Sequence, residues 1–259
     1  MANTQKLSVV IPAYKAEKYI VKNIKNLESV LSTTSYDYEI IVVVDGDIDR
    51  TLQRANRYAR NKNHIKSFTY PNNKGKGNAV RHGFSKAKGD LIGFIDAGLD
   101  LDPNAMHMLL AHFEWYNADI IVGSKRHPAS KIEYPWQRKI LSFGYQYIVL
   151  FLFGLKIRDT QVGIKIFRAE VVKKILPRLL VKAFAFDIEM LAVANYLGYK
   201  RIFEAPINLK MDFSQSTIAS KGFIKTSFWM LWDTLAVFYR LKIIDFYNYK
   251  NRKLWIDYK

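Results

Sequence analysis

The sequence contains no cysteine in its 259 residues, which excludes disulfide bonds and thiolate metal sites. Acidic residues are also scarce, because 23 Asp and Glu stand against 40 Lys and Arg and leave a formal net charge of +17. Such an excess of positive charge suits nucleic acid, an anionic membrane surface or a phosphorylated substrate. The sequence has no recognition helix, zinc pattern or aromatic RNA-binding motif. We therefore expect no nucleic acid partner and keep a basic nucleic-acid-binding protein only as an alternative.

The sequence also lacks a long uninterrupted hydrophobic run, and no charged-then-apolar leader precedes its first strand-like run. The missing leader favours an intracellular protein. Residues 140–155 ("ILSFGYQYIVLFLFGL") are uncharged but include two glycines, Ser142 and Gln146, and residues 227–241 are interrupted by Asp233. Because a membrane-spanning helix needs roughly 20 apolar residues, we expect neither segment to cross a bilayer.

These two apolar segments suit either the protein core or the surface of a membrane. The first is compatible with both, whereas the second is rich in Trp, Phe and Tyr and is flanked by Lys and Arg. Aromatic side chains beside basic ones are typical of helices at the membrane–water interface. We therefore predict a catalytic domain over residues 1–215 and a tail of amphipathic, membrane-surface helices over residues 216–259. The protein is expected to bind peripherally at the cytoplasmic face of a membrane.

The first half of the sequence alternates short β-branched runs with segments of helical spacing. The runs are residues 7–11, 38–44, 65–70, 90–96 and 118–123. Between the first two, apolar residues recur at three- and four-residue intervals from Ile20 to Leu31, as on one face of a helix. Strand–helix alternation repeated four times predicts an α/β fold with a doubly wound, mainly parallel sheet. Ligands of such sheets bind beyond the carboxyl ends of the strands, so we expect the site there.

A loop with two glycines, "NKGKGNAVRHG" at residues 73–83, follows the third run and leads into a predicted helix. It has neither the third glycine of a dinucleotide-binding loop nor the Gly-Lys-Ser/Thr ending of a P-loop. Glycines before a helix let backbone N–H groups approach an anion. The loop is therefore interpreted either as a contact for a phosphate or as a plain entry turn.

Carboxylates gather where the fourth run ends, at Asp96, Asp100 and Asp102. Such a cluster is costly unless it is paired or binds a cation, and it suits a divalent ion that shares its coordination shell with phosphate oxygens. Asp102 precedes Pro103, an ordinary start of a helix, so we assign Asp102 to capping. Asp96 and Asp100 are the predicted ligands of Mg²⁺ or Mn²⁺.

Eight segments resemble glycosyltransferase family two, in the order and spacing of that family. They are "VVIPAYKAE", "VVVDGDID", "NKGKGNAVRHG", "FIDAGLD", "VGSKR", "RDTQVGIKIFR", "FAFDIEML" and "EAPI". The resemblance covers roughly residues 6–240 and is greatest to the polyprenyl-phosphate branch, more to its dolichyl-phosphate glucose synthases than to its mannose synthases. It implies a nucleotide-diphosphosugar transferase fold of GT-A type. It also implies inverting transfer of a hexose, here glucose, from a UDP-sugar donor to a polyprenyl phosphate acceptor.

The resemblance further implies roles for individual residues. Those facing the donor nucleotide are Pro12, Tyr14, Glu17, Asp45, Lys76, Gly77 and Gln161. Those with a part in catalysis are Asp96, Asp159 and Asp187. Asp159 and Gln161 lie on the loop that closes the sugar pocket. Those that hold the acceptor phosphate are Arg126, Arg138, Ser142 and Lys210.

The sequence departs from the family pattern at three places. Gly98 replaces the second carboxylate of the Asp-x-Asp metal motif, so either Asp100 takes over or metal binding is weakened. Val44 stands in place of one of two adjacent aspartates where the base is read. The stretch after "EAPI" lacks the usual arginine, for which Lys210 is the candidate replacement. A non-catalytic descendant that binds a sugar nucleotide therefore stays an alternative.

The nature of the acceptor decides whether the reaction needs a base. A lipid phosphate, with a second pKa of about 6, is largely a dianion at neutral pH and is already a nucleophile. A sugar hydroxyl needs a base, for which Asp187 is the candidate, although this residue also suits the N-terminus of a helix. A GDP-mannose-dependent lipid-phosphate transferase and a transferase to a sugar hydroxyl stay as alternatives.

Overall fold

The computed structural model describes residues 5–98, 101–130, 136–182, 185–208 and 223–255, with the backbone alone for 136–142 and 223–227. Its centre is a seven-stranded sheet in the order β3-β2-β1-β4-β6-β5-β7. The strands are β1 Lys6–Ala13, β2 Asp37–Val44, β3 Ile65–Thr69, β4 Leu91–Ile95, β5 Ile120–Ser124, β6 Ile164–Arg168 and β7 Ile202–Pro206. Only β6, among these strands, is antiparallel to its neighbours β4 and β5.

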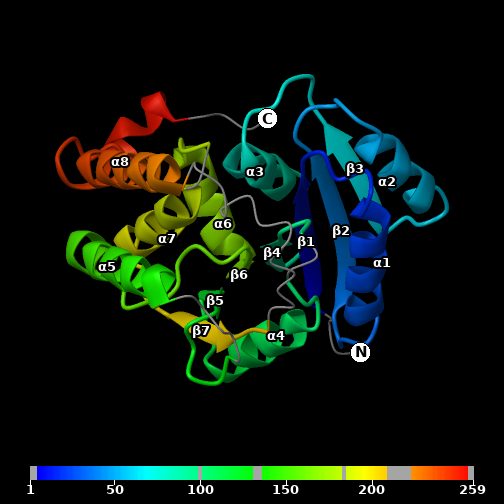
Figure 1. The fold of residues 1–259 in the computed structure, drawn as a ribbon, viewed down its shortest axis with the longest axis horizontal. Helices are drawn as coiled ribbons and strands as arrows, with labels where there is room; N and C mark the ends of the chain where they lie inside the picture. Colours follow the sequence, from blue (N-terminus) through cyan, green and yellow to red (C-terminus); the bar gives the residue numbers. More distant parts are fainter. Residues whose placement is uncertain (1–4, 99–100, 131–135, 183–184, 209–222, 256–259) are drawn as a thin grey trace.

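Helices cover both faces of the sheet (Figure 1). The α-helices are α1 Ile20–Leu31, α2 Thr51–Ala59, α3 Lys76–Lys86, α4 Ala105–Trp115, α5 Trp136–Phe153, α6 Ala169–Ile175, α7 Phe186–Tyr196 and α8 Phe223–Lys242. Two 3₁₀ helices, η1 Leu176–Arg178 and η3 Tyr249–Leu254, complete the described elements. The bounds of α1 coincide with the predicted helical spacing from Ile20 to Leu31.

Two hydrophobic cores, one on each face, result from the alternation of side chains along the buried strands. On β1, Val9 joins the core under α1 and α4, whereas Val10 joins the core under α3, α6 and α7. Side chains alternate in this way because successive residues of a strand point to opposite faces. The predicted α/β fold with a doubly wound, mainly parallel sheet is thereby confirmed.

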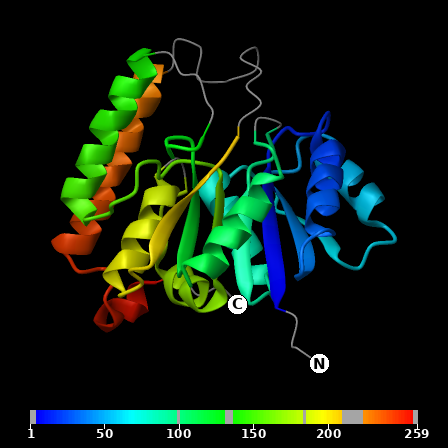
Figure 2. The same cartoon turned by 90° about the horizontal axis from the view of Figure 1, so that it is seen from below.

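The two long helices α5 and α8 pack against each other beside α7, at one end of the molecule (Figure 2). Tyr145 of α5 and Thr234 of α8 share a hydrogen bond of 2.8 Å, and the rings of Phe153 and Phe238 meet edge to face. No helix among the described residues is both long and apolar enough to cross a membrane.

Glu28 ties the first two helices to β3 and gives the fold a measurable pH dependence. It accepts hydrogen bonds from Tyr58 Oη at 2.5 Å and Lys62 Nζ at 2.6 Å, and His64 Nε2 lies 2.8 Å away. Burial alone would raise the pKa of Glu28, but the hydrogen bonds from Lys62, Tyr58 and His64 lower it to about 2.

Because the folded pKa lies below the ordinary value of 4.5, the ionised carboxylate stabilises the fold fully above that value. This contribution is lost as the pH falls towards 2. Glu28→Gln should lower the free energy of unfolding at pH 7 by on the order of 3 kcal/mol, at about 1.4 kcal/mol per pKa unit. Urea unfolding between pH 3 and 7 checks this, with Asp37→Asn as the control, since Asp37 makes only an exposed ion pair of 3.8 Å.

Candidate active site

The carboxyl edge of the sheet brings together the ends of β1, β2 and β4 and the start of the antiparallel β6. Asp96 directly follows β4, and its backbone N–H donates to Gly163 O at 2.8 Å. A Cβ atom at Gly163 would lie 1.9 Å from Asp96 Oδ2, so any other residue there would force the Asp96 carboxylate to move. The lack of a side chain at residue 163 therefore leaves room for Asp96 in its observed position.

Lys76, the first residue of α3, pairs with Asp96. Its Nζ lies 2.6 Å from Oδ1 and 2.7 Å from Oδ2 of Asp96, and the two side chains keep 32% and 35% of their surface exposed. Burial opposes the charge of Lys76, but the carboxylates of Asp96 and Asp187 outweigh it and raise its pKa. The site thus places a half-buried ammonium and a half-buried carboxylate side by side.

Backbone N–H groups at three positions of the glycine-containing loop bind protein acceptors. The N–H groups of Lys74 and Gly75 donate to Asp45 at 2.7 and 2.9 Å, and Gly77 N donates to Lys182 O at 2.9 Å. Gly75 has φ +91°, and an added Cβ would lie 2.5 Å from Lys182 O. These glycines therefore allow the chain at residue 182 to approach, and the loop offers the Lys76 side chain to a ligand.

Asp45 has a supporting place under this loop. It is buried, and besides the two backbone N–H groups it accepts a hydrogen bond from Tyr70 Oη at 2.8 Å. The carboxylate thus accepts from three protein donors and holds the loop that carries Lys76.

A second ion pair lies buried behind Lys76. Lys165 Nζ contacts Asp187 Oδ1 and also donates to Val162 O at 2.6 Å, and both charged side chains are buried. Burial raises the pKa of Asp187 and lowers that of Lys165, while the attraction between them works against both shifts. Asp187 is therefore enclosed by protein, which argues against its predicted part as a base that contacts an acceptor and for a part in positioning.

The first residues predicted to line the nucleotide lie at the end of β1 and just after it. Pro12 is buried within the strand and pairs with Val43, whereas Tyr14 is exposed at the edge of the sheet. Glu17 accepts a hydrogen bond from Arg50 N at 3.2 Å. Tyr14 is thus the most accessible of these three, although Lys15 Nζ lies over its ring, 5.4 Å from the centroid.

The predicted sugar-pocket loop leads into β6. Asp159 is buried, accepts from Lys125 N at 3.3 Å and donates its own N–H to Glu204 at 3.0 Å. Within the described parts of the chain, the buried Nε2 of Gln161 has no hydrogen-bond partner. An unused buried donor costs free energy unless a ligand accepts from it, so Gln161 is well placed to bind one.

The predicted acceptor residues are described only in part. Arg126 stacks on the ring of Phe143 in α5 at 3.9 Å from its centroid, and its Nη1 donates to Arg158 O at 2.9 Å. The backbones of Arg138 and Ser142 belong to α5, but their side chains lie outside the described residues, as do Lys210 and the metal candidate Asp100 entirely.

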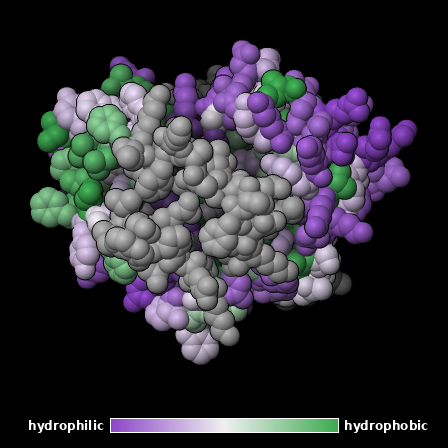
Figure 3. Space-filling model, viewed as in Figure 1, coloured by the Kyte–Doolittle hydropathy of each residue, from purple (hydrophilic) through white to green (hydrophobic). Residues whose placement is uncertain are grey.

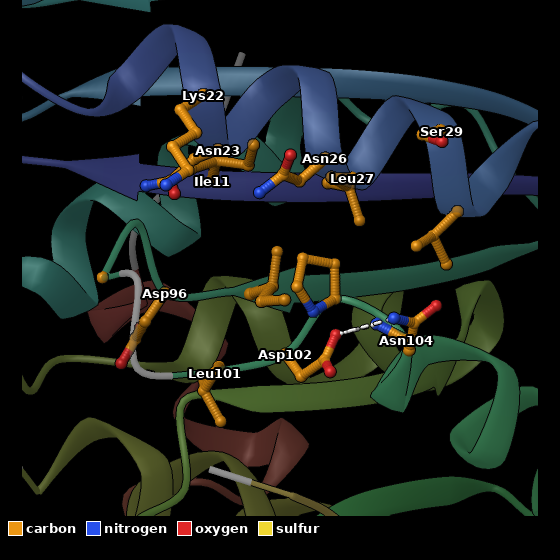
Figure 4. Close-up of a pocket in the computed structure, with 14 residues that line it drawn as sticks. Ile11, Lys22, Asn23, Asn26, Leu27, Ser29, Asp96, Leu101, Asp102 and Asn104 are labelled. Carbon is orange, nitrogen blue, oxygen red and sulfur yellow. Dashed lines mark hydrogen bonds between the residues drawn. The ribbon is translucent and has the colours of Figure 1, made fainter. Parts of the chain in front are cut away.

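A pocket of about 360 Å³ opens between α1 and the connection from β4 to α4, with Asp96 at one end (Figure 4). Asp102 Oδ1 accepts from the backbone and side-chain nitrogens of Asn104 at 3.0 and 2.9 Å, and α4 begins only at Ala105. Asp102 therefore accepts from the backbone two residues on, as predicted for a cap, but it does so in the turn that leads into α4, because the regular helix begins two residues later than predicted.

Asp96 is the one of the two predicted metal ligands that lies within the described residues. Asp96 Oδ1 is buried and lies 2.6 Å from Lys76 Nζ, without a well-aligned hydrogen bond. The part of the chain that the structure describes contains no group of three or more His, Asp or Glu side chains that could hold a metal alone. Oxygen atoms of a bound diphosphate are the usual additional ligands of Mg²⁺.

The architecture is that of sugar-nucleotide transferases of GT-A type. The structure resembles glucosyl-3-phosphoglycerate synthase from Mycobacterium tuberculosis, solved with Mn²⁺, uridine diphosphate and phosphoglyceric acid, with a TM-score of 0.67 at 17% identity over 90% of this chain and 78% of that one. Mannosyl-3-phosphoglycerate synthase from Rubrobacter xylanophilus gives 0.68 at 15% identity, over 92% and 75%. At these identities the likeness concerns the fold.

Residues 8–176 match the model of glycosyl transferase family 2, and the chain belongs to this family of glycosyltransferases. It is 32% identical to human dolichyl-phosphate beta-glucosyltransferase over 74% of this chain and 64% of that protein. A dolichyl-phosphate beta-glucosyltransferase of Trichomonas vaginalis is 30% identical over 92% of this chain and 75% of its own length. The chain therefore spans somewhat less than two thirds of the human relative. These findings confirm the predicted family.

Proposed function

We propose that this protein transfers glucose from UDP-glucose to a polyprenyl phosphate, with inversion, at a membrane surface. The observation that carries the proposal is the identity of about 30% with dolichyl-phosphate beta-glucosyltransferases along most of the chain. The match to the family model over residues 8–176 includes the segments that form the Lys76–Asp96 site. A fold shared with a transferase solved with UDP-glucose and Mn²⁺ supports the donor class.

The Lys76–Asp96 pair is proposed to serve the donor diphosphate. As the bond between the anomeric carbon and the diphosphate oxygen breaks, negative charge grows on the leaving group, and a fixed cation stabilises it. Lys76 supplies an ammonium there, and its raised pKa keeps it charged at neutral pH. Asp96, with Asp100, would hold Mg²⁺ or Mn²⁺, whose charge adds to that of Lys76 when the ion is bound.

The acceptor is proposed to be a phosphate, because Asp187, the candidate base for a hydroxyl acceptor, is enclosed by protein and paired with Lys165. A lipid phosphate attacks the anomeric carbon with an oxygen that is already ionised, so it needs positioning and no proton acceptor. Arg126 is proposed to contribute to that positioning, since a guanidinium matches the oxygens of a phosphate and stays charged. Its contact with Phe143 joins it to α5, one of the two helices proposed to meet the membrane.

The outer faces of α5 and α8 carry exposed hydrophobic side chains. They are Phe143, Tyr147, Ile148, Leu150, Phe151, Phe228, Trp229, Trp232, Leu235 and Tyr239. Figure 3 shows hydrophobic residues gathered at the end of the molecule that these helices form. Contiguous exposed apolar area of this kind marks an interaction surface, and aromatic residues next to Arg240 and Lys242 suit an anionic bilayer.

Binding to anionic vesicles should depend on these aromatic residues. The double variant Trp229→Ser/Trp232→Ser is expected to bind phosphatidylserine-containing vesicles roughly tenfold more weakly, because two interfacial rings are lost. Rising salt should weaken wild-type binding. Sedimentation with vesicles measures both effects. Trp115→Ser is the matched control, because Trp115 of α4 is 84% exposed but lies away from α5 and α8, and an equal loss in this variant would contradict the assignment.

A paired assay tests the proposed function. UDP should raise the melting temperature of the protein more than GDP, and labelled glucose from UDP-glucose should appear in a polyprenyl-phosphate product. A larger shift with GDP and transfer from GDP-mannose would favour the mannose-transferring alternative. Transfer to a soluble glycoside in place of the lipid phosphate would favour a hydroxyl acceptor. Donor binding without transfer to any acceptor would indicate a non-catalytic descendant.

A further inference from the structure

Glu189 of α7 is a fully buried carboxylate that has no part in the chemistry proposed above. Its Oε2 accepts hydrogen bonds from Leu180 N at 2.9 Å and Val181 N at 2.8 Å. Its Oε1 accepts from Tyr247 Oη at 2.8 Å and lies 3.5 Å from Arg240 Nη2. A buried charge with so many partners is costly to assemble, so the arrangement calls for an explanation.

The segment of residues 179–182 lies between Glu189 and the start of α3. Its two central N–H groups point to Glu189, whereas its outer carbonyl groups accept hydrogen bonds from α3. Leu179 O accepts from the buried Arg81, and Lys182 O accepts from Gly77 N at 2.9 Å. Glu189 thus holds one side of this segment while the other side holds α3.

The contact on the α3 side includes the residue that meets the donor in the proposed function. Lys76 stands between Gly75, which leaves no room for a Cβ beside Lys182 O, and Gly77, whose N–H binds the same carbonyl. Any displacement of residues 181–182 therefore moves the backbone on both sides of Lys76. The Lys76 ammonium would then leave its place 2.6 Å from Asp96.

The partners on the opposite side of Glu189 come from the C-terminal part of the chain. Arg240 belongs to α8, and Tyr247 follows it. The backbone of Tyr247 is fixed as well, because Arg178 Nε donates to Tyr247 O at 2.8 Å. Glu189 therefore joins the end of α8 to the segment that supports the donor loop.

We propose that Glu189 is a positioning residue for Lys76, which acts through residues 179–182, and that Tyr247 and Arg240 link this support to α8. The inference rests on the proposed function only in taking a uridine nucleotide as the ligand of the Lys76 site. It assigns a use in donor binding to a C-terminal segment that makes no described contact with that site.

Two variants of Glu189 separate positioning from general stability. Glu189→Gln keeps a side-chain oxygen of the same reach for the N–H groups of Leu180 and Val181, whereas Glu189→Met keeps the length and removes both acceptors. The dissociation constant for UDP, measured by calorimetry well below the melting temperature, should rise at least about tenfold in Glu189→Met and at most about threefold in Glu189→Gln. Equal affinities in the two variants and the wild type would overturn the proposal.

The matched control is Asp119→Asn. Asp119 is another buried carboxylate, and it accepts from the backbone N–H of Arg201 at 3.1 Å and from the Arg201 side chain. It precedes β5 and so lies at the end of the sheet opposite the carboxyl ends of β1, β2 and β4. This variant should lower the melting temperature without changing the affinity for UDP. A loss of affinity as large as that in Glu189→Met would show that any buried carboxylate has this effect, and would overturn the proposal.

Hydrogen exchange of the Gly77 amide gives a readout that needs no ligand. Tyr247→Phe removes one hydrogen bond to Glu189 and is expected to speed exchange at Gly77 at least about threefold, because the acceptor Lys182 O is less firmly held. Unchanged exchange at Gly77 would overturn the proposal. This test can be made even if Glu189→Met does not fold, because it does not use that variant. If the wild type binds no uridine nucleotide, the proposed donor is wrong, and the exchange at Gly77 decides the inference by itself.

Discussion

Replacing Asp96 with asparagine is expected to lower the rate of sugar transfer by about 10²–10³-fold, the effect of removing one preorganised electrostatic group from an active site. The substitution keeps the shape of the side chain beside Gly163 but removes the charge that holds Lys76 Nζ in place. It also removes the carboxylate that is proposed, with Asp100, to hold a divalent cation. The rate at saturating donor and lipid phosphate, with and without Mg²⁺, is the measurement.

Asp102→Asn is the control for this prediction. Asp102 lines the same pocket but binds Asn104 in the turn before α4, so its loss should change stability and leave the rate within about threefold. The assignment of Asp96 fails if Asp96→Asn transfers sugar at the wild-type rate. If chelation of metal leaves the wild-type rate unchanged while Asp96→Asn is inactive, Asp96 acts through Lys76 and the metal site is wrong.

The Lys165–Asp187 pair should produce the largest loss of stability in the chain. Lys165→Met leaves Asp187 as an unpaired buried carboxylate, and removing one partner of such a pair costs about 3–5 kcal/mol. Asp187→Leu should cost a similar amount, because it leaves the buried Lys165 without its counter-charge. The double variant Lys165→Met/Asp187→Leu should recover most of the loss, since it leaves neither charge unpaired. Urea unfolding of the four proteins measures the coupling.

The double variant also tests the chemistry of the acceptor. If Asp187 acts as a base, the double variant should transfer no sugar. If the acceptor is a lipid phosphate, the stable double variant should keep measurable transfer. A double variant as unstable as either single one would contradict the pairing.

Much of the fold could be predicted from the sequence, because buried parallel strands and amphipathic helices leave local patterns. The spacing from Ile20 to Leu31 and the apolar run before Asp96 are such patterns, and both match the structure. The sequence pattern does not predict strand β6, because "IKIF" is short and includes Lys165. A lysine normally indicates an exposed position, but this one is buried. Only the ion pair with Asp187, distant in sequence, makes that lysine acceptable inside.

The candidate site could be located from the sequence but not assembled. The positions of Asp96 and of the loop before α3 at the carboxyl ends of predicted strands indicated that the two would lie close together. The pairing of Lys76 with Asp96 could not be predicted, because it depends on how α3 packs against the sheet. The use of the loop glycines could not be predicted either, because their neighbour Lys182 comes from a segment about a hundred residues later. The contacts of Glu189 with Tyr247 and Arg240 could not be predicted from local sequence patterns for the same reason. The division into residues 1–215 and 216–259 stays a prediction.

The missing side chain of Gly163 matters for judging natural variants of this protein. Residue 163 carries no reactive group, yet even alanine there would place a carbon atom in the space of the Asp96 carboxylate. Because the clash involves only the end of a side chain, the aspartate would rotate away without unfolding the sheet. Under the proposed function, such a variant would therefore be abundant in the cell, correctly folded and inactive. Genetic screens that score variants by protein level would class it as harmless, and only a measurement of product would reveal the defect.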